Sequence, residues 1–398
     1  MSSFTGGSNI SMCVLVFFCD FLPFEFFLSG SDHLLILIAI LFITNKFFLL
    51  KECSFTHWNM GCRLSVNRFD AIDGTRGILA GMVMLSHMFG SFMGWPQVRP
   101  FSGAYLCVVY FFIMSGFVLT YAHASGNFFK YVLTRFARLW PLHFLSTILM
   151  VAIYYYNAHH GGYVSSPDVF SISVILKNIL FLHGLYWHDF KLVNEPSWSI
   201  SIEFWVSLLI PLIFTRLGNM TRAVVAGLLF IFLWHKHPSG IPPSMLTAML
   251  SMLIGSLFFS LSQTEYFKCL MKEKFMAFFI TAAAIVSIVG VYAMNHSRLD
   301  YFLFVAFIPM LFIDHLPDNQ LIKRIFTSNL FLFLGYISFP LYLLHELVIV
   351  SGFIFDSENA WVSISIAAFA SIFIAYIYTR FIDYPLYRAL KRQIAKIS

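Results

Sequence analysis

The residues best suited to chemistry lie in one apolar stretch near the start of the chain, from residue 72 to residue 90. This stretch contains Asp73, Arg76 and His87. Charged groups at membrane depth are costly, so within a hydrophobic span they are candidates for function. At 100° per residue the three side chains fall along one strip of a helix, with Arg76 and His87 roughly 16 Å apart along its axis. The small residue Ala80 lies between them, which predicts a polar groove.

A structural interpretation competes with the functional one. Asp73 and Arg76 are spaced i,i+3 and could form only a local ion pair at one end of a helical bundle. A single membrane histidine often does no more than form a hydrogen bond between helices. We favour function for Arg76 and His87, because a local pair does not account for a histidine three turns deeper in the span.

Polar residues also begin or interrupt later apolar stretches. Ser115 and Gly116 favour close approach of another helix, and a small polar gap that admits a ligand is the alternative. Arg135 and Arg138, at i,i+3 where a span begins, could anchor the inner side of the membrane or clamp phosphate groups near a helix N-terminus. Glu203 is expected in the first turn of its helix, where the dipole favours a carboxylate, and its entry into an apolar run favours function.

Two late spans carry further candidates. Ser338, Tyr342 and His345 share one face of a helix predicted over 329–351, and Glu346 follows His345 directly. In the last span, Arg380 and Asp383 are spaced i,i+3, which predicts a local ion pair.

The composition requires a membrane to position these residues. The chain of 398 residues is 59% hydrophobic and 11% charged, whereas soluble domains are about 25% charged. We therefore predict an all-α integral membrane protein with about ten transmembrane helices. The stretch 170–187 is interrupted by polar residues and is expected to be interfacial or re-entrant. The ten predicted spans are 72–90, 104–123, 136–157, 200–217, 222–236, 244–262, 275–294, 299–314, 329–351 and 361–382.

The distribution of Lys and Arg predicts how these spans are oriented. If residue 67 is cytoplasmic, 17 of the 25 basic residues fall in inner loops and five in outer loops. This bias favours ten spans with both ends of the core in the cytoplasm, and we expect a multi-pass protein of the inner membrane. It also places His87, Glu203, His345 and Glu346 towards the outer half, and Arg76, Arg135 and Arg138 at the inner side.

The remaining features of the composition exclude several other classes of protein. The net charge of +6 comes from short loop clusters, which does not favour a nucleic-acid partner. The six cysteines lack CxxC spacing, so we do not expect a disulfide framework. We assign 67–398 to the membrane domain. Residues 1–66 contain a further apolar stretch at 34–50, which either forms an extra helix or precedes a true start near residue 60.

Five motifs, in order and at suitable spacing, resemble the membrane acyltransferase 3 family. Its Arg-x10-His pattern is matched by Arg76 and His87. The final span often carries Glu-x-Pro in the family and Asp383-Tyr-Pro385 here, and Thr134 stands where the family commonly has a further arginine. The motifs are FDAIDGTRG at 69–77, FFIMSGF at 111–117, RFARLWP at 135–141, WSISIE at 198–203 and YISFPLYLLH at 336–345.

The resemblance implies a ten-helix bundle that transfers an acyl group, usually acetyl, from cytosolic acyl-CoA to a hydroxyl of a glycan or glycolipid. It implies that His87 and Arg76 are the catalytic pair and that Arg135 and Arg138 assist at the CoA end, where we also place Asp73. We expect no metal cofactor.

A mechanism follows as a hypothesis. His87 is expected to act as general base, Arg76 or Ser115 to stabilise the oxyanion, and Glu203 or His345 to orient His87. A proton-coupled transporter or a flippase of a glycan intermediate is the competing interpretation, since such proteins also place charged residues within the membrane.

Overall fold

The structure, a computed structural model, describes residues 69–94, 100–123, 127–185, 191–352 and 359–397, and these residues form helices but no strand. The predicted segment 1–66 lies outside the described residues.

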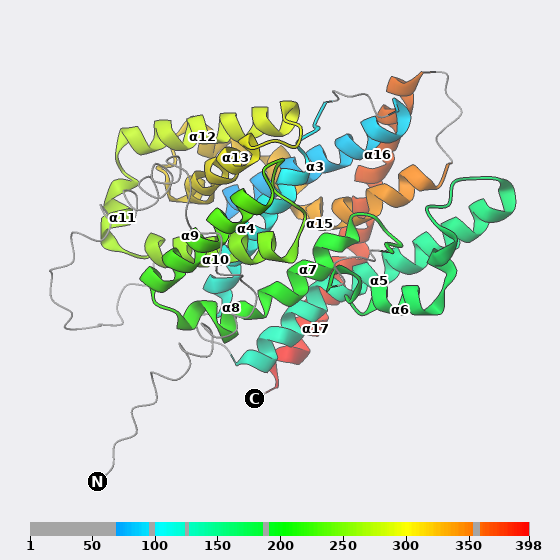
Figure 1. Cartoon of the computed structure of the whole chain (residues 1–398), viewed down its shortest axis with the longest axis horizontal. Helices are drawn as coiled ribbons and strands as arrows, with labels where there is room; N and C mark the ends of the chain where they lie inside the picture. Colours follow the sequence, from blue (N-terminus) through cyan, green and yellow to red (C-terminus); the bar gives the residue numbers. More distant parts are fainter. Residues whose placement is uncertain (1–68, 95–99, 124–126, 186–190, 353–358, 398) are drawn as a thin grey trace, which may run out of the picture. The chain divides into compact units, whose positions relative to one another are not determined.

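Figure 1 shows the arrangement of the helices. In chain order the elements are α3 (Asp70–Phe92), α4 (Tyr105–His123), α5 (Phe128–His160), η2 (Pro167–Phe170), α6 (Ile172–Ile179), η3 (His183–Leu185), α7 (Ser197–Ser207), α8 (Leu209–Leu212), η4 (Phe214–Arg216), α9 (Asn219–Lys236), α10 (Met245–Ser262), α11 (Glu265–Leu270), α12 (Lys274–Ala293), α13 (Leu299–Phe307), η5 (Ile308–His315), α14 (Leu321–Phe326), α15 (Asn329–Val350), α16 (Ala360–Tyr378), η6 (Thr379–Asp383) and α17 (Tyr384–Ala395).

Seven helical segments among the described residues are long and apolar enough to cross a membrane. The predicted class, an all-α multi-pass membrane protein, is therefore confirmed. The predicted count of about ten is not, because α3, α9 and the α13–η5 segment fall outside this set. The seven segments are Tyr105–Ala122, Phe128–His160, Ser197–Arg216, Met245–Ser262, Lys274–Ala293, Asn329–Val350 and Ala360–Ala395.

Two predicted segments differ in detail from regular membrane helices. The stretch 299–314 divides into α13 and the 3₁₀ helix η5, which has Pro309 in its first turn. The part of the predicted stretch 170–187 that the structure describes, residues 170–185, contains α6, with eight residues, and short 3₁₀ turns. A helix of that length cannot cross a bilayer, in agreement with an interfacial or re-entrant segment.

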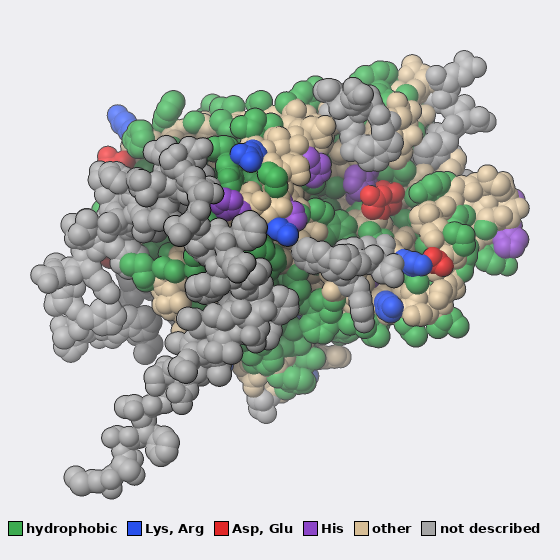
Figure 2. Space-filling model, in the orientation of Figure 1, with side chains coloured by type: hydrophobic (Ala, Val, Ile, Leu, Met, Phe, Trp, Pro, Cys, Tyr) green, Lys and Arg blue, Asp and Glu red, His purple; other side chains and the backbone are tan. Residues whose placement is uncertain are grey.

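Apolar side chains face outward from the helices. Phe278 on α12 is 71% exposed and Phe369 on α16 is 72% exposed. On the face shown in Figure 2, hydrophobic side chains cover large areas and charged side chains occur singly or in small groups. In water such surfaces would favour association, whereas lipid tails solvate them without cost. These helices therefore present their outer faces to a bilayer.

Helix α3 packs closely along α15. A Cβ atom added at Gly77 would overlap the backbone of Gly335, and one added at Gly335 would overlap the carbonyl oxygen of Asp73. The two glycines thus let the helix backbones approach within the reach of short polar side chains. This contact places the charged strip of α3 directly against α15.

The small residues predicted on α4 serve two neighbours. A Cβ at Gly116 would overlap the backbone of Met252 on α10, so the predicted close helix approach is present. Ser115 faces elsewhere, since its hydroxyl donates a hydrogen bond to Glu203 on α7. Adjacent residues on a helix point about 100° apart, so Gly116 can face α10 while Ser115 faces α7.

Candidate active site

Arg76 joins α3 to α15. Its Nε donates to Ser338 Oγ at 2.8 Å and its Nη2 donates to the Gly335 carbonyl at 2.9 Å. The predicted local pair with Asp73 is also present, with 3.0 Å between Nη2 and Oδ1. Because the guanidinium binds a second helix as well, its role extends beyond a local ion pair.

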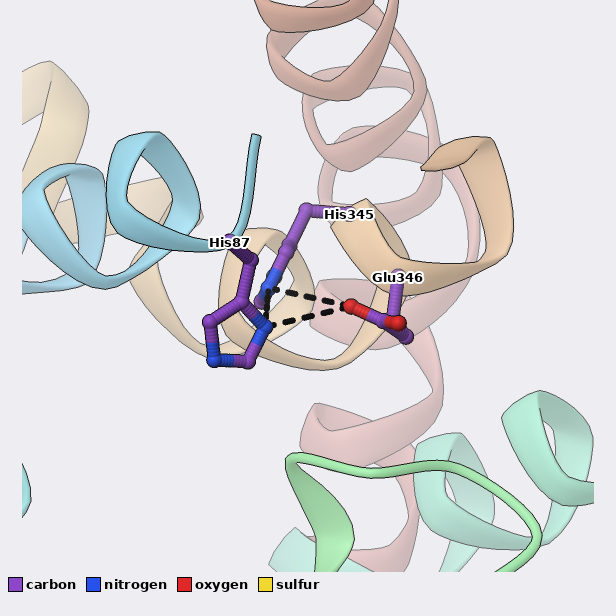
Figure 3. A group of neighbouring side chains, drawn as sticks. All are labelled: His87, His345 and Glu346. Carbon is purple, nitrogen blue, oxygen red and sulfur yellow. Dashed lines mark hydrogen bonds and ion pairs between the residues drawn. The ribbon is translucent and has the colours of Figure 1, made fainter. Parts of the chain in front are cut away.

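His87 meets two residues of α15 at the opposite end of the strip (Figure 3). His87 Nδ1 lies 3.1 Å from Glu346 Oε2 and 3.2 Å from His345 Nε2. The His345 side chain is fully buried and the Glu346 side chain is 12% exposed, whereas that of His87 is 26% exposed. His87 is therefore the member of the cluster that a substrate can reach.

The hydrogen bonds assign the ring hydrogens of the neutral histidines. His345 Nδ1 lies 2.9 Å from the Leu341 carbonyl, which can only accept, so this nitrogen carries the hydrogen and Nε2 has a lone pair. His87 Nδ1–H donates to the Glu346 carboxylate. With its ring hydrogen on Nδ1, neutral His87 has a lone pair on Nε2, and a general base needs such a lone pair to accept a proton.

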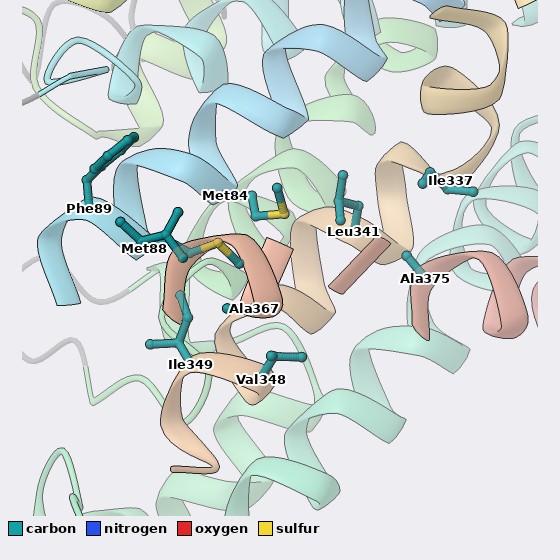
Figure 4. Close-up of a cluster of buried hydrophobic side chains, with 10 residues drawn as sticks. Met84, Met88, Phe89, Ile337, Leu341, Val348, Ile349, Ala367 and Ala375 are labelled. Carbon is teal, nitrogen blue, oxygen red and sulfur yellow. The ribbon is translucent and has the colours of Figure 1, made fainter. Parts of the chain in front are cut away.

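A buried hydrophobic cluster holds the helices around these polar residues (Figure 4). Met84 and Met88 of α3 pack with Leu341 and Val348 of α15 and with Ala367 of α16. All five side chains are less than 9% exposed. Such packing fixes side-chain rotamers, so His87 and Glu346 are held in place by helices rather than by loops.

Arg76 and His87 lie too far apart to contact one atom. Their partners Ser338 and His345 are seven residues apart on α15, which corresponds to about 10 Å of helix. A single carbonyl oxygen therefore cannot touch both side chains in this arrangement. Sequence spacing placed the two on one strip, but the structure assigns them to different ends of it.

A cavity of about 430 Å³ opens at the Arg76 end. It contains six of the eight predicted site residues, and the predicted groove residue Ala80 also lines it. His87 and His345 are not among its lining residues. The polar lining consists of Asp73, Arg76, Ser115, Tyr121, Arg135, Arg138, Ser199, Glu203, Ser338 and Tyr342, and the apolar lining includes Phe111, Met114 and Leu119.

Glu203 lies with Arg135 rather than with His87. Its Oε1 accepts from Arg135 Nη2 at 2.6 Å and from Ser115 Oγ at 2.9 Å. The expectation that Glu203 joins the histidines in the outer half, where it could orient His87, is therefore wrong. Its expected place in the first helical turn is wrong as well, because α7 begins at Ser197, almost two turns earlier.

The two arginines of α5 have separate carboxylate partners. Arg138 Nη1 binds Asp383 Oδ2 at 2.6 Å, and its guanidinium lies over the rings of Phe339 and Tyr387. The expected Arg380–Asp383 pair is wrong, because Thr379–Asp383 forms a π-helical turn that changes the angular spacing of side chains. The expected helix N-terminus beside the arginines is also wrong, since α5 begins at Phe128.

The cavity keeps unused donors despite these pairs. Arg135 is buried and its Nε has no hydrogen-bond partner. Arg138 is partly exposed to the cavity that both arginines line. A guanidinium has five N–H donors in a planar fork that suits phosphate oxygens. Because both arginines line the cavity, it presents two guanidinium groups to an anionic ligand.

Tyr342 separates the cavity from the histidines. Its ring lines the cavity and meets the His345 ring edge-on at a centroid distance of 6.4 Å. Its hydroxyl lies 2.8 Å from Ser199 Oγ. The shared face of Ser338, Tyr342 and His345 was visible from helical spacing, whereas the contact of Glu346 with His87 had no local sequence signal. The helices thus place a polar cavity on one side of Tyr342 and the cluster of His87, His345 and Glu346 on the other, within a membrane fold.

Comparison with known proteins identifies the family. The model of an acyltransferase domain, that of acyltransferase 3, matches residues 69–380. The chain therefore belongs to the acyltransferase 3 family. It is also 38% identical over 96 residues to a Rhizobium radiobacter protein described as "Protein 2 in picA locus", a match that covers 22% of this chain and 46% of that protein. The chain thus spans about half the length of this relative. No solved structure matches the chain.

Proposed function

We propose that this protein is an integral membrane O-acyltransferase that moves an acyl group, most simply acetyl, from cytosolic acyl-CoA to a hydroxyl of an exported polysaccharide or a glycolipid. The observation that carries the proposal is the cavity with Arg76, Arg135 and Arg138, whose lining residue Tyr342 also contacts His345 in the cluster of His87, His345 and Glu346. Family membership supports this class of reaction. We place the core termini in the cytoplasm, an orientation that the distribution of basic residues supports, and we propose the cell inner membrane as the location.

The donor is proposed to bind in the cavity. Its phosphates would bind the free N–H groups of Arg135 and Arg138, and Asp73 would hold Arg76 in place beside its acyl arm. The apolar walls, including Phe111 and Met114, suit a flexible acyl chain and its linker. A volume of about 430 Å³ lies within the range of small-molecule pockets, roughly 300–1,000 Å³.

The acceptor is proposed to approach the partly exposed ring of His87. Its hydroxyl gives its proton to His87 Nε2 as the oxygen attacks the thioester carbon. The Glu346 carboxylate stabilises the imidazolium that forms. The tetrahedral intermediate then expels the CoA thiolate, which takes the proton back from His87, so that the products are an ester and free CoA thiol.

The other predicted residues take supporting roles in this scheme. Arg76 positions the donor arm, since about 10 Å of helix separates its partner on α15 from that of His87. Ser115 lies in the cavity and remains the candidate donor to the oxyanion. His345 accepts or shares the His87 hydrogen and so acts as a positioning residue. Glu203 holds Arg135 and Ser115.

Acyl transfer is tested with membranes that contain equal amounts of wild-type protein or His87→Ala. Labelled acetyl-CoA and glycan free of acetyl esters are added, and base-labile ester label is measured. The proposal predicts label with the wild type and none above background with His87→Ala. His159→Ala is the matched control, because that histidine is exposed at the end of α5.

Each result decides between the candidate functions. Equal label with wild-type protein and His87→Ala would exclude His87 as the base. Intact acetyl-CoA in every sample, together with glycan movement that depends on a proton gradient, would favour the transporter or flippase over the acyltransferase. A transferase consumes the thioester whether or not a gradient is present.

A further inference from the structure

Three ligand atoms converge where α3 meets α15. His87 Nδ1, His345 Nε2 and Glu346 Oε2 all lie within 4.8 Å of one another. Figure 3 shows the two imidazole rings and the carboxylate directed at a common point. The side chains of His345 and Glu346 are 0% and 12% exposed, so water has little access to that point.

The cluster has more lone pairs than hydrogens. His345 Nε2 carries a lone pair, because its Nδ1–H is used by the Leu341 carbonyl. Glu346 Oε2 is an acceptor when ionised. A single ring hydrogen on His87 Nδ1 is therefore shared by two acceptors, at 3.1 and 3.2 Å. A cation at the common point would satisfy all three atoms at once.

The spacing of the three atoms suits a tetrahedral metal ion. Zn²⁺ binds imidazole nitrogen and carboxylate oxygen at about 2.0–2.2 Å, which gives ligand atoms about 3.4 Å apart in a tetrahedron. The observed edges are 3.1, 3.2 and 3.9 Å. The hydrogen bond from His345 to Leu341 is the outer-shell contact that orients metal-binding histidines.

We propose that His87, His345 and Glu346 form a binding site for one borderline divalent transition metal ion, for which Zn²⁺ is the probe. Two imidazoles favour such ions over Mg²⁺ and Ca²⁺, which prefer oxygen ligands. Three protein ligands leave a fourth position open. Neither His345 nor Glu346 lies near His87 in sequence, so no metal-binding spacing is visible in the chain itself.

Binding of the ion has a consequence for catalysis, and this part rests on the proposed function. When the metal binds Nδ1 of His87, the hydrogen of the neutral ring moves to Nε2, and a metal–nitrogen bond replaces the shared hydrogen bond. Nε2 then carries a hydrogen and cannot accept the proton of an acceptor hydroxyl. Zn²⁺ therefore inhibits acyl transfer by occupying the base.

The site is tested by binding to the purified full-length protein in detergent after metals are removed with a chelator. Zn²⁺ is titrated against a chromophoric competitor, and Co²⁺ is added separately to follow the absorption bands of a tetrahedral ion. One Zn²⁺ per wild-type chain is expected, and a large excess of Mg²⁺ should not displace it. His87→Ala removes one ligand and Glu346→Gln weakens another. Each variant should bind Zn²⁺ with an affinity lower by roughly 10- to 100-fold or more.

His159→Ala is the control and should bind Zn²⁺ as the wild type does. Thermal melting of each variant shows whether it is folded. The fold should tolerate His87→Ala most easily, because the side chain that it removes is partly exposed. Equal affinity in wild-type protein and both ligand variants, or no stoichiometric binding, overturns the site. Binding does not require acyl transfer, so its loss and a failure of the proposed function are seen separately.

Inhibition is measured in the acetyl-CoA assay. Saturating Zn²⁺ should lower the wild-type rate at least tenfold, and a chelator should restore it. An unchanged rate in a protein shown to bind Zn²⁺ at these residues would refute the inhibitory role of the ion.

Discussion

Replacement of Glu346 by glutamine tests whether a buried carboxylate makes His87 an effective base. The variant keeps the shape of the side chain but removes the charge that lies 3.1 Å from His87 Nδ1. We expect kcat to fall by roughly 30- to 150-fold, with little change in the KM for acyl-CoA. The donor cavity does not include Glu346, so donor binding has no reason to weaken.

The magnitude follows from the loss of a charge-assisted contact. Two unit charges about 3 Å apart attract by about 5 kcal/mol at an effective dielectric constant of 20. The neutral amide retains part of the hydrogen bond, whose net contribution is about 0.5–1.5 kcal/mol. A loss of about 2–3 kcal/mol in transition-state stabilisation corresponds to the expected fall in rate. The amide can also donate to Nδ1 and leave Nε2 protonated, which adds to the loss.

The assay measures initial rates of CoA thiol release by purified protein at several acyl-CoA concentrations. Glu265→Gln is the matched control, because Glu265 is an exposed carboxylate paired with Lys268, and its rate should equal that of the wild type. Thermal melting confirms that Glu346→Gln is folded. A kcat within threefold of the wild type, or a loss confined to KM, would refute the role of Glu346 as the partner of the base.

Three other predictions concern the cavity and the helix contact. Arg138→Lys keeps the positive charge opposite Asp383 but loses the planar guanidinium. The KM for acyl-CoA should therefore rise by about tenfold, with kcat within threefold of the wild type. An unchanged KM in the same kinetic assay would contradict phosphate binding at Arg138. Ser115→Ala should lower kcat by roughly 10²-fold or more if the hydroxyl contacts the oxyanion, and a change below threefold would assign Ser115 only to holding Glu203. Gly77→Ala should lower the free energy of unfolding by about 1–3 kcal/mol, because the added Cβ overlaps the backbone of Gly335. Gly81→Ala is the control, since a Cβ there would have no atom within 4 Å, and it should be neutral or stabilising by up to about 1 kcal/mol. Equal melting temperatures of the two variants in detergent would contradict the close packing of α3 on α15.

The sequence determined the features that depend on local composition and on helix geometry. Long apolar stretches with little charge can be solvated only by lipid, so the all-α membrane class was evident. The fixed rise and rotation of a helix placed Asp73 beside Arg76, and the structure contains that pair. Five ordered motifs indicated the family that matches residues 69–380.

Hydropathy located membrane crossings but not helix ends. The helices that carry Arg135 and Glu203 begin at Phe128 and Ser197, eight and three residues before the predicted spans 136–157 and 200–217. An apolar window reports where lipid surrounds a helix, and the backbone hydrogen bonds continue beyond it. The helix-dipole arguments for these residues failed for that reason.

Only the tertiary structure decided which charged residues meet. Arg135 binds Glu203, Arg138 binds Asp383 and His87 binds Glu346, at sequence separations of 68, 245 and 259 residues. A buried charge must find an opposite charge, but this rule does not say which one. The choice depends on the close approach of α3 to α15 at Gly77 and on the π-helical turn before Tyr384. Both set the direction of side chains through packing between helices, which local spacing along one chain does not contain.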